Sequence, residues 1–424
     1  MIMPKIKNIR GRQVLDSRGT PTVMAIVELE NKIIGSAITP SGASTGTLEA
    51  VELRDDGTVY FGKGVLRAIK NIDTSISRSL IGMEVENQEE IDARLCELDG
   101  TANKAKLGAN ATVAVSLACL RAASNSSGEA IYKTLGGNIL PVPFMNVING
   151  GKHAGSGLAV QEFMIAPIGF KSFSQALRAG AETYHALKAI IKKQYGPLGT
   201  NVGDEGGFAP MIQDTNEALN LLESAIEEAG YKKNIQLASD AAASSFYDTN
   251  TKKYLIDGKE LEEEELIDYW KELTSSYPIV SLEDPFDEKG FYAYAKLREK
   301  IGKHTQIVGD DLTVTNLKLV KKAKKDRAIN TLLLKVNQIG TISEAIEAAK
   351  YCLEHKMGVM VSHRSGETED TTIADLSVGI NCAQIKTGAP CRGERTAKYN
   401  RLLAIEEELG SDAKFLGAKS LVRY

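Results

Sequence analysis

The pattern of apolar and polar residues changes once along the chain, near residue 140. From the N-terminus to about residue 60, apolar and polar residues alternate, which is typical of antiparallel strands with one buried face. The clearest examples are residues 22–28 (TVMAIVE) and 33–38 (IIGSAI). Helical segments follow, among them an alanine-rich run at residues 108–124 that we expect to be a closely packed helix. The pattern predicts a small α+β domain, residues 1–138.

Beyond residue 141 the chain consists of short continuous apolar runs separated by amphipathic segments. Such runs predict parallel strands buried on both faces. About eight strand–helix units favour a closed, TIM-like β/α barrel over an open sheet, with residues 139–424 as the barrel domain. The first two strands have no helix between them, which departs from strict alternation. The predicted strands are residues 144–148, 162–165, 236–240, 279–283, 306–310, 331–335, 358–363 and 382–386, and the clearest predicted helices are residues 216–230, 341–354 and 396–409.

Composition excludes several classes of protein. The formal net charge of −4 creates no positive field for nucleic acid, and we read the basic run 321–325 as the solvated face of a helix. No apolar stretch is long enough to span a membrane, and the first residues contain no signal-peptide core, so we expect a cytoplasmic protein. Five scattered cysteines argue against a disulfide framework or zinc cluster and predict buried free thiols.

Six of the predicted strands end in an ionisable side chain. In a β/α barrel the carboxyl ends of the strands meet at one mouth, where active sites are built. Bringing such groups together costs free energy unless they bind a charged ligand or metal ion. Any single one could begin an ordinary polar loop, but six in succession, with both signs of charge, favour a functional site. The six are Asp240, Glu283, Asp310, Lys335, His363 and Lys386.

These strand ends divide into two halves of opposite charge. The carboxylates of Asp240, Glu283 and Asp310 form an all-oxygen set, which suits Mg²⁺ and disfavours zinc. The other half is cationic and suits an anionic substrate such as a phosphate ester. A metal ion together with a lysine favours removal of a proton next to a carboxylate, and we expect neighbouring cations to lower the pKa of the lysine. The cationic half comprises Lys335, His363, Arg364 and Lys386, with the Ser365 hydroxyl beside them.

Ten motifs resemble those of the enolase family, in the family's order and over nearly the whole chain. Any one of them could occur by chance, but ten in order could hardly do so. A lysine base paired with Mg²⁺ is also a chemistry of that superfamily. The motifs are LDSRGTPTV (15–23), PSGASTG (40–46), NVINGGKHAG (146–155), QEFMIAP (161–167), GDEGGFAP (203–210), SLEDP (281–285), VGDDLTVTN (308–316), LLLKVNQIGT (332–341), VSHRSGETEDTTIADL (361–376) and QIKTGAP (384–390).

The resemblance implies a role for each matching residue. Lys335 corresponds to the base that removes the C2 proton of 2-phosphoglycerate, and Glu205, in GDEGG, to the acid that assists loss of the C3 hydroxyl. Protonation is needed there because hydroxide is a poor leaving group. The implied metal ligands are Asp240, Glu283 and Asp310 for a first magnesium ion and Ser44 for a second, which arrives with substrate. The implied substrate-binding residues are His153, Gln161, Glu162, His363, Arg364, Ser365 and Lys386.

The activity implied by the resemblance is the reversible dehydration of 2-phosphoglycerate to phosphoenolpyruvate in glycolysis and gluconeogenesis, with two Mg²⁺ per active site. It also implies a homodimer or octamer, a cytoplasmic location and no nucleic-acid partner, and it leaves an additional cell-surface location open. Residues 54–64, Ser245 and Gly393 depart from common family patterns, and we expect residues 54–64 near the contact between the two domains.

Two alternatives compete with this interpretation. The first is another enzyme of the enolase superfamily, such as a racemase or a sugar-acid dehydratase. The SGAST, GDEGG and SHRSGETED motifs argue against it, because such enzymes usually lack them. The second is a non-catalytic binding protein on the same scaffold. The intact candidate acid, base and metal ligands argue against that alternative, although they do not exclude an additional adhesive role.

Overall fold

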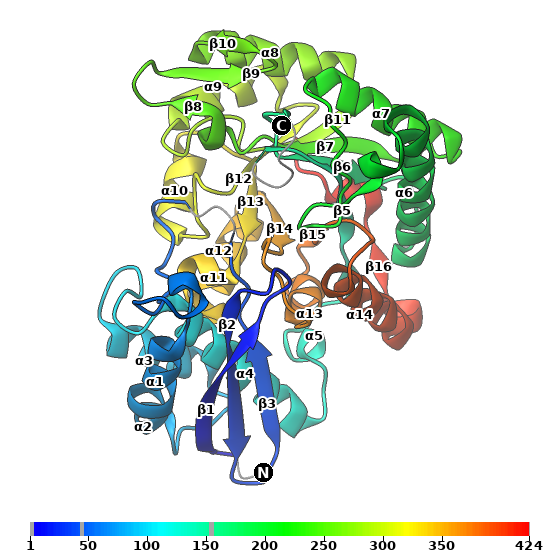
Figure 1. Ribbon diagram of the computed structural model, residues 1–424. Helices are drawn as coiled ribbons and strands as arrows, with labels where there is room; N and C mark the ends of the chain where they lie inside the picture. The colour runs from blue at the N-terminus through cyan, green and yellow to red at the C-terminus, as the bar shows by residue number, and fades with distance from the viewer. Residues whose placement is uncertain (1–3, 43–45, 152–156, 424) are drawn as a thin grey trace.

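The computed structural model describes residues 4–42, 46–151 and 157–423, so Ser44 and His153 lie outside the described residues. The N-terminal part contains a three-stranded antiparallel sheet of order β1-β2-β3, followed by helices (Figure 1). The two strands expected from alternation are confirmed as β2 and β3. The strands are β1 Ile6–Leu15, β2 Pro21–Leu29 and β3 Ile34–Ile38, and the helices are α1 Leu66–Asn71, α2 Ser77–Leu80, α3 Gln88–Asp99, α4 Ala109–Ser127 and α5 Ile131–Thr134.

Helix α4 is the expected alanine-rich helix, and it is buried over most of its length. Its small side chains allow β3 to approach very closely. A Cβ atom added at Gly35 would lie 2.2 Å from the backbone nitrogen of Ala122 and 2.4 Å from the carbonyl oxygen of Ala118. Glycine in the strand and alanine in the helix are therefore both required by this packing.

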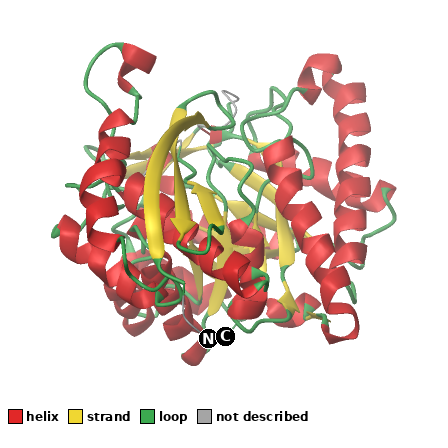
Figure 2. Cartoon of the chain, turned by 90° about the horizontal axis from the view of Figure 1, so that it is seen from below, coloured by secondary structure: helices red, strands yellow, loops and turns green. Residues whose placement is uncertain are grey.

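The second part is a closed eight-stranded barrel of order β11-β12-β13-β14-β15-β5-β6-β7. Helices surround the strands (Figure 2). The strands are β5 Val142–Asn149, β6 Glu162–Ala166, β7 Gln236–Asp240, β11 Ile279–Glu283, β12 Gln306–Gly309, β13 Thr331–Leu334, β14 Gly358–Ser362 and β15 Ala383–Lys386. The helices are α6 Phe173–Tyr195, α7 Thr215–Glu228, α8 Glu263–Ser276, α9 Phe291–Ile301, α10 Leu317–Lys325, α11 Val336–Ile339, α12 Ile342–Glu354, α13 Thr372–Gly379 and α14 Gly393–Leu409.

The expectation of an entirely parallel sheet is wrong at β6, which is antiparallel to both of its neighbours. The reason is the missing helix: β5 and β6 follow one another directly, so the chain must turn back on itself. Two helices, α6 and α7, then precede β7 and restore the common strand direction. The reversal places the N-terminal end of β6 at the barrel mouth, where Glu162 is the register partner of Asp240.

Short additional strands complete the barrel domain. Three of them form a small sheet, and β4 pairs in parallel with β16 near the C-terminus. They are β8 Tyr247–Asp248, β9 Lys253–Ile256, β10 Lys259–Leu261, β4 Ile139–Leu140 and β16 Lys414–Phe415. The basic run lies in α10, where Val320 and Ala323 are buried and most lysines are exposed, as expected for a solvated helix face.

Apolar side chains from seven of the barrel strands form one cluster, and the ionisable side chains lie at the carboxyl ends of the strands. Among the described helices, none is both long and apolar enough to cross a membrane. The cysteines are free, but only three are buried, since Cys96 and Cys391 are partly exposed. The side chains of Arg54 and Asp55 bond to Pro21, Lys63, Leu66 and Arg67, so these bonds of the segment 54–64 stay within the N-terminal part.

Candidate active site

The six ionisable strand-end residues lie at one mouth of the barrel, as predicted. Three of them are the last residues of their strands and three follow their strands directly. Five are buried and Lys335 is nearly so. One cavity is lined by most of the residues that the sequence singled out: Gln161, Glu162, Glu205, Asp240, Asp310, Lys335, His363, Arg364, Ser365 and Lys386. Glu283 joins this group through its contact with Lys386.

The Lys386 ammonium lies among the carboxylates of the acidic half. Its Nζ lies 2.9 Å from Oδ2 of Asp240, 2.8 Å from Oε2 of Glu283 and 3.2 Å from Oε1 of Glu162. Burial disfavours the ammonium, but the three carboxylates outweigh it and raise the pKa of Lys386 well above its ordinary value. Lys386 is therefore charged, and it offsets the mutual repulsion of carboxylates from three strands.

Lys335 forms a second ion pair, and its net pKa shift is opposite to the lowering that we expected from the sequence. Its Nζ lies 2.5 Å from Oδ2 of Asp310. Burial and the cations Arg364 and Lys386 lower the pKa of Lys335, as expected, but Asp310 acts in the opposite direction and the net pKa is raised. The sequence does not reveal this contact, because Asp310 and Lys335 follow different strands and are 25 positions apart. In this arrangement Lys335 is protonated and cannot accept a proton.

The carboxylates expected to hold Mg²⁺ come from three neighbouring strands. Asp240 and Glu283 are register partners in β7 and β11, and Asp310 follows β12, the next strand. All three are buried and supply only oxygen ligands, which fits a hard divalent cation. Burial, with Asp240 as the next largest cause, raises the pKa of Glu283 well above its ordinary value, and a metal ion would relieve this repulsion.

Another group of carboxylates lies closer together at the same mouth. Oxygens of Asp284, Asp310 and Asp311 lie within 4.8 Å of one another. The Asp284 carboxylate, however, already accepts bonds from the backbone nitrogens of Asp310 (2.9 Å) and Asp311 (2.8 Å) and from the Tyr294 hydroxyl (2.8 Å). Burial and then Asp310 raise the pKa of Asp284 to about 7. Asp284 thus fixes the loop that carries Asp310, a role that the sequence did not reveal.

Glu205 reaches the cavity from a glycine-bounded loop. Its carboxylate accepts hydrogen bonds from Nδ2 of Asn146 (2.9 Å) and from Oγ of Ser365 (3.2 Å). Gly206 has φ +83°, and a Cβ atom at Gly207 would lie 2.3 Å from Oδ1 of Asn149. The two glycines therefore let the loop pass close against β5 and turn Glu205 inward.

Gln161 and Glu162 reach the same cavity because β6 is reversed. Both are buried, and Oε1 of Gln161 and Oε2 of Glu162 have no hydrogen-bond partner among the described residues. Burial, followed by the nearby Glu205 charge, raises the pKa of Glu162 well above its ordinary value. Such orphaned polar atoms are costly in a folded protein, and a polar ligand in the cavity would satisfy them.

His363 and Arg364 lie on the loop after β14. Burial lowers the pKa of His363 to about 4, so its imidazole is neutral near pH 7. Arg364 donates from Nη1 to Oε2 of Glu49 (2.9 Å) and to Oδ1 of Asn337 (3.1 Å). Glu49 belongs to the N-terminal part, so that part of the chain helps to hold the Arg364 guanidinium at the strand-end cavity.

Among the described residues that contact the site, the sequence did not single out Glu49, Asn146, Asp284 or Arg395. Asn146 gave a readable signal, since it is an amide inside an otherwise apolar strand. The other three gave none, because their role depends on partners that are distant in the sequence or on backbone atoms.

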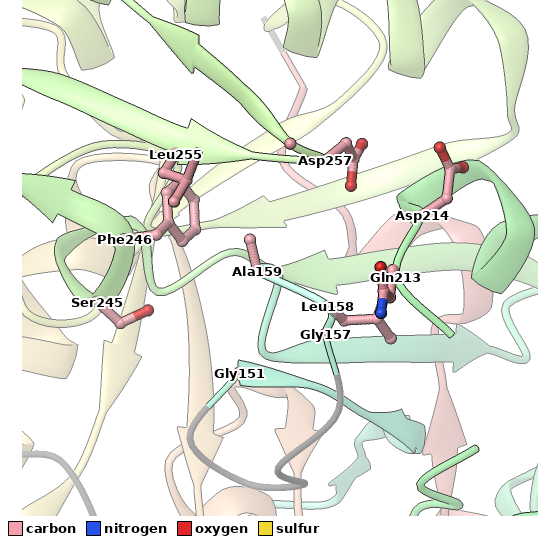
Figure 3. A pocket seen from close by; sticks show the side chains of 11 residues that line it. Gly151, Gly157, Leu158, Ala159, Gln213, Asp214, Ser245, Phe246, Leu255 and Asp257 are labelled. Carbon is pink, nitrogen blue, oxygen red and sulfur yellow. The ribbon is translucent and has the colours of Figure 1, made fainter. Parts of the chain in front are cut away.

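A separate and larger pocket, of about 770 Å³, lies beside the small β8–β10 sheet (Figure 3). Its described wall carries Leu158, Phe246 and Leu255 together with Asp214 and Asp257, and none of the described residues lines both this pocket and the strand-end cavity. Ser245, which departs from the common family residue, lines this pocket and not the strand-end cavity.

Comparison with known proteins agrees with this geometry. Residues 6–135 match the family profile described as "Enolase, N-terminal domain", and residues 137–423 match "Enolase, C-terminal TIM barrel domain". Enolase of Methanopyrus kandleri is 57% identical over 97% of this chain and 98% of its own length. Enolase of Methanocaldococcus jannaschii is 54% identical over 96% of each, and that of Solanum lycopersicum 53% over 98% of each. The chain therefore belongs to the enolase family of Mg²⁺-dependent hydro-lyases, which dehydrate 2-phosphoglycerate to phosphoenolpyruvate.

Proposed function

We propose that the strand-end cavity divides this dehydration between Lys335 as base and Glu205 as acid. The observation that carries the proposal is that one cavity is lined by both residues, Lys335 directly after β13 and Glu205 in the 203–207 loop, together with carboxylates and cations from other strands. The reaction needs all of these groups, because a weakly acidic proton is removed and a poor leaving group is then lost.

In the first step Nζ of Lys335 takes the C2 proton, and the electron pair moves into the substrate carboxylate to give an enediolate. In the second step the pair returns to form the C2–C3 double bond while the C3–O bond breaks. Glu205 gives its proton to the departing oxygen, so the products are phosphoenolpyruvate and water. Lys335 must be neutral at the start, so its ion pair with Asp310 has to weaken before the reaction.

The remaining residues position the substrate. Arg364 and Ser365 suit its phosphate, because a guanidinium and a hydroxyl offer several donors, and Lys386 suits its carboxylate region. Gln161 and Glu162, with His153 outside the described residues, suit the leaving hydroxyl. Asp240, Glu283 and Asp310 would hold one Mg²⁺, and Ser44, also outside the described residues, would help to hold a second. When bound, Mg²⁺ would stabilise the negative charge that develops on the substrate carboxylate.

Separating the two steps tests these roles. Glu205→Gln should keep the exchange of the C2 proton with solvent deuterium, followed by NMR, while dehydration falls by about 10²–10⁴-fold, followed by phosphoenolpyruvate absorbance. Lys335→Ala should abolish both signals. Glu228→Gln, on the exposed end of α7, serves as the control and should leave both unchanged. Loss of exchange in Glu205→Gln with magnesium binding intact would overturn the assignment of Glu205.

Mg²⁺-dependent turnover in the unaltered protein would exclude the non-catalytic alternative. The homodimeric or octameric state and the cytoplasmic location stay predictions from the resemblance. Sedimentation velocity distinguishes a dimer from an octamer, and a purely monomeric sample would contradict both.

A further inference from the structure

Arg395, in the first turn of α14, is completely buried, and its guanidinium lies between two loops of the active site. It donates from Nη1 to the carbonyl oxygen of Arg364 (2.7 Å) and from Nη2 to the carbonyl oxygens of Ser365 (2.6 Å) and Asp204 (2.9 Å). Its Nε lies 3.6 Å from the Glu394 carboxylate. Arg395 thus connects the 363–365 segment to the loop that carries Glu205.

The fourth bond of Arg395 determines the protonation of a histidine ring. Nη1 lies 2.7 Å from Nδ1 of His363. A guanidinium has only donors and keeps its charge, so Nδ1 must be the acceptor. A neutral imidazole carries one proton, and burial keeps His363 neutral near pH 7. The proton therefore resides on Nε2, which lies 3.5 Å from Oε2 of Glu205.

Gly388 leaves room for both the Arg395 side chain and the backbone of the Glu205 loop. Gly388 has φ +80°, and a Cβ atom there would lie 3.0 Å from Cδ of Arg395 and 2.7 Å from the carbonyl oxygen of Glu205. The next residue, Ala389, donates its backbone N–H to that same carbonyl oxygen (2.9 Å). The arginine stem and the Glu205 loop are thus packed against the same glycine.

We propose that Arg395 is a positioning residue that fixes His363 as its Nε2–H tautomer and directs this donor toward the Glu205 carboxyl group. The proposal rests on the proposed role of Glu205 as the acid of the second step. When Glu205 gives up its proton, a carboxylate is left in a buried site, and a neighbouring N–H donor stabilises it. The opposite tautomer would present a lone pair to that carboxylate and would lose the bond to Arg395.

The tautomer can be measured directly in the unaltered protein. Long-range ¹H–¹⁵N spectra of protein labelled at the histidine ring nitrogens distinguish a protonated from an unprotonated nitrogen. The chain has five histidines, so His363→Asn identifies the signals of His363 by their loss. We expect a protonated Nε2 and an unprotonated Nδ1 near pH 7. A proton on Nδ1 of His363, or a ring that exchanges equally between both forms, would overturn the proposal.

Arg395→Lys then tests the catalytic consequence, because one ammonium cannot reproduce a planar guanidinium that reaches His363 and both loops. We expect dehydration to fall by about 10²-fold while C2 proton exchange, measured at saturating substrate, falls much less. Arg401→Lys, farther along the same helix and paired with Asp375, is the matched control and should leave both steps unchanged. Equal losses of exchange and dehydration in Arg395→Lys would show a general structural role and overturn the proposal. If Glu205→Gln still dehydrated substrate, the acid assignment would fail, whereas the tautomer result would stand.

Discussion

Lys386 shows how a single residue offsets the repulsion among the carboxylates at the barrel mouth. Its ammonium contacts carboxylates from β6, β7 and β11, and all four side chains are buried. Buried ion pairs of this kind add little net stability, because desolvation offsets most of the attraction. Their value lies in holding charged groups where an anionic substrate and a metal ion can use them.

A prediction at the residue scale concerns the rate at which the Cys96 thiol is alkylated and its dependence on pH. Burial, and then the Glu344 carboxylate 3.6 Å away, raise the pKa of Cys96 from 9.0 to about 11. Since the thiolate is the reactive form, alkylation at pH 8 should be about 100-fold slower than for a thiol of ordinary pKa. The rate should rise about tenfold per pH unit until about pH 11. Iodoacetamide labelling with peptide mass mapping measures it.

Two controls make this labelling experiment decisive. Glu344→Gln removes the charge that raises the pKa and should accelerate labelling of Cys96. Protein unfolded in guanidinium chloride should react at the rate of a free thiol. Rapid alkylation of native Cys96 at pH 8 would contradict the predicted pKa shift.

The part of the site that could be read from the sequence follows from strand geometry. A polar residue that ends a buried apolar run marks a barrel mouth, so Asp240, Glu283 and Lys386 could be placed together in advance. Glu205 lies in a loop and was identified only through the GDEGG resemblance. The bond between Arg395 and the carbonyl oxygen of Asp204 joins residues 191 positions apart, and local pattern carries no information about such a contact.

At the scale of elements, the direction of β6 depends on the connection that precedes it and not on its own sequence. The apolar runs predicted every barrel strand to within a few residues, because continuous burial leaves a clear pattern. They could not predict the direction of β6, since its residues are equally buried in either direction. The absence of a helix before β6 was the available signal, and it correctly marked the departure from β/α alternation.

The contact between β3 and α4 gives a prediction for packing between elements. Gly35→Ala would force a methyl group against backbone atoms of Ala118 and Ala122, which no side-chain rotation can relieve. We expect a loss of about 1–3 kcal/mol or more in the free energy of unfolding, measured by urea denaturation. In Gly393→Ala, by contrast, the new methyl group meets open space at the start of α14, and stability should stay constant or rise slightly. Equal urea midpoints for the two variants would contradict this account.

At the scale of the whole molecule, the proposed domains 1–138 and 139–424 share hydrogen bonds that each would lack alone. Helix α12 of the barrel begins against the N-terminal part: Oγ of Ser116 accepts from the backbone nitrogen of Ile342 (3.0 Å), and Thr112 donates to the carbonyl oxygen of Gly340 (2.7 Å). Glu49 likewise reaches across to Arg364. The N-terminal part thus contacts both the start of a barrel helix and a residue that lines the strand-end cavity, so we expect the two domains to unfold together.

Asp92 offers the sharpest test of that coupling. It is buried in α3, and its Oδ2 accepts from the backbone nitrogen (2.9 Å) and the hydroxyl (2.6 Å) of Ser343, in the first turn of α12. Asp92→Ala leaves these donors without their acceptor, which should cost about 1–3 kcal/mol. Calorimetry should show one transition in the unaltered protein and a lower, broader or divided transition in the variant. Glu89→Ala, on the exposed face of the same helix, should leave the transition where it is. Two separate transitions in the unaltered protein would mean that the domains are stable independently, and Asp92 would then be a local cap of α12 and not a link between them.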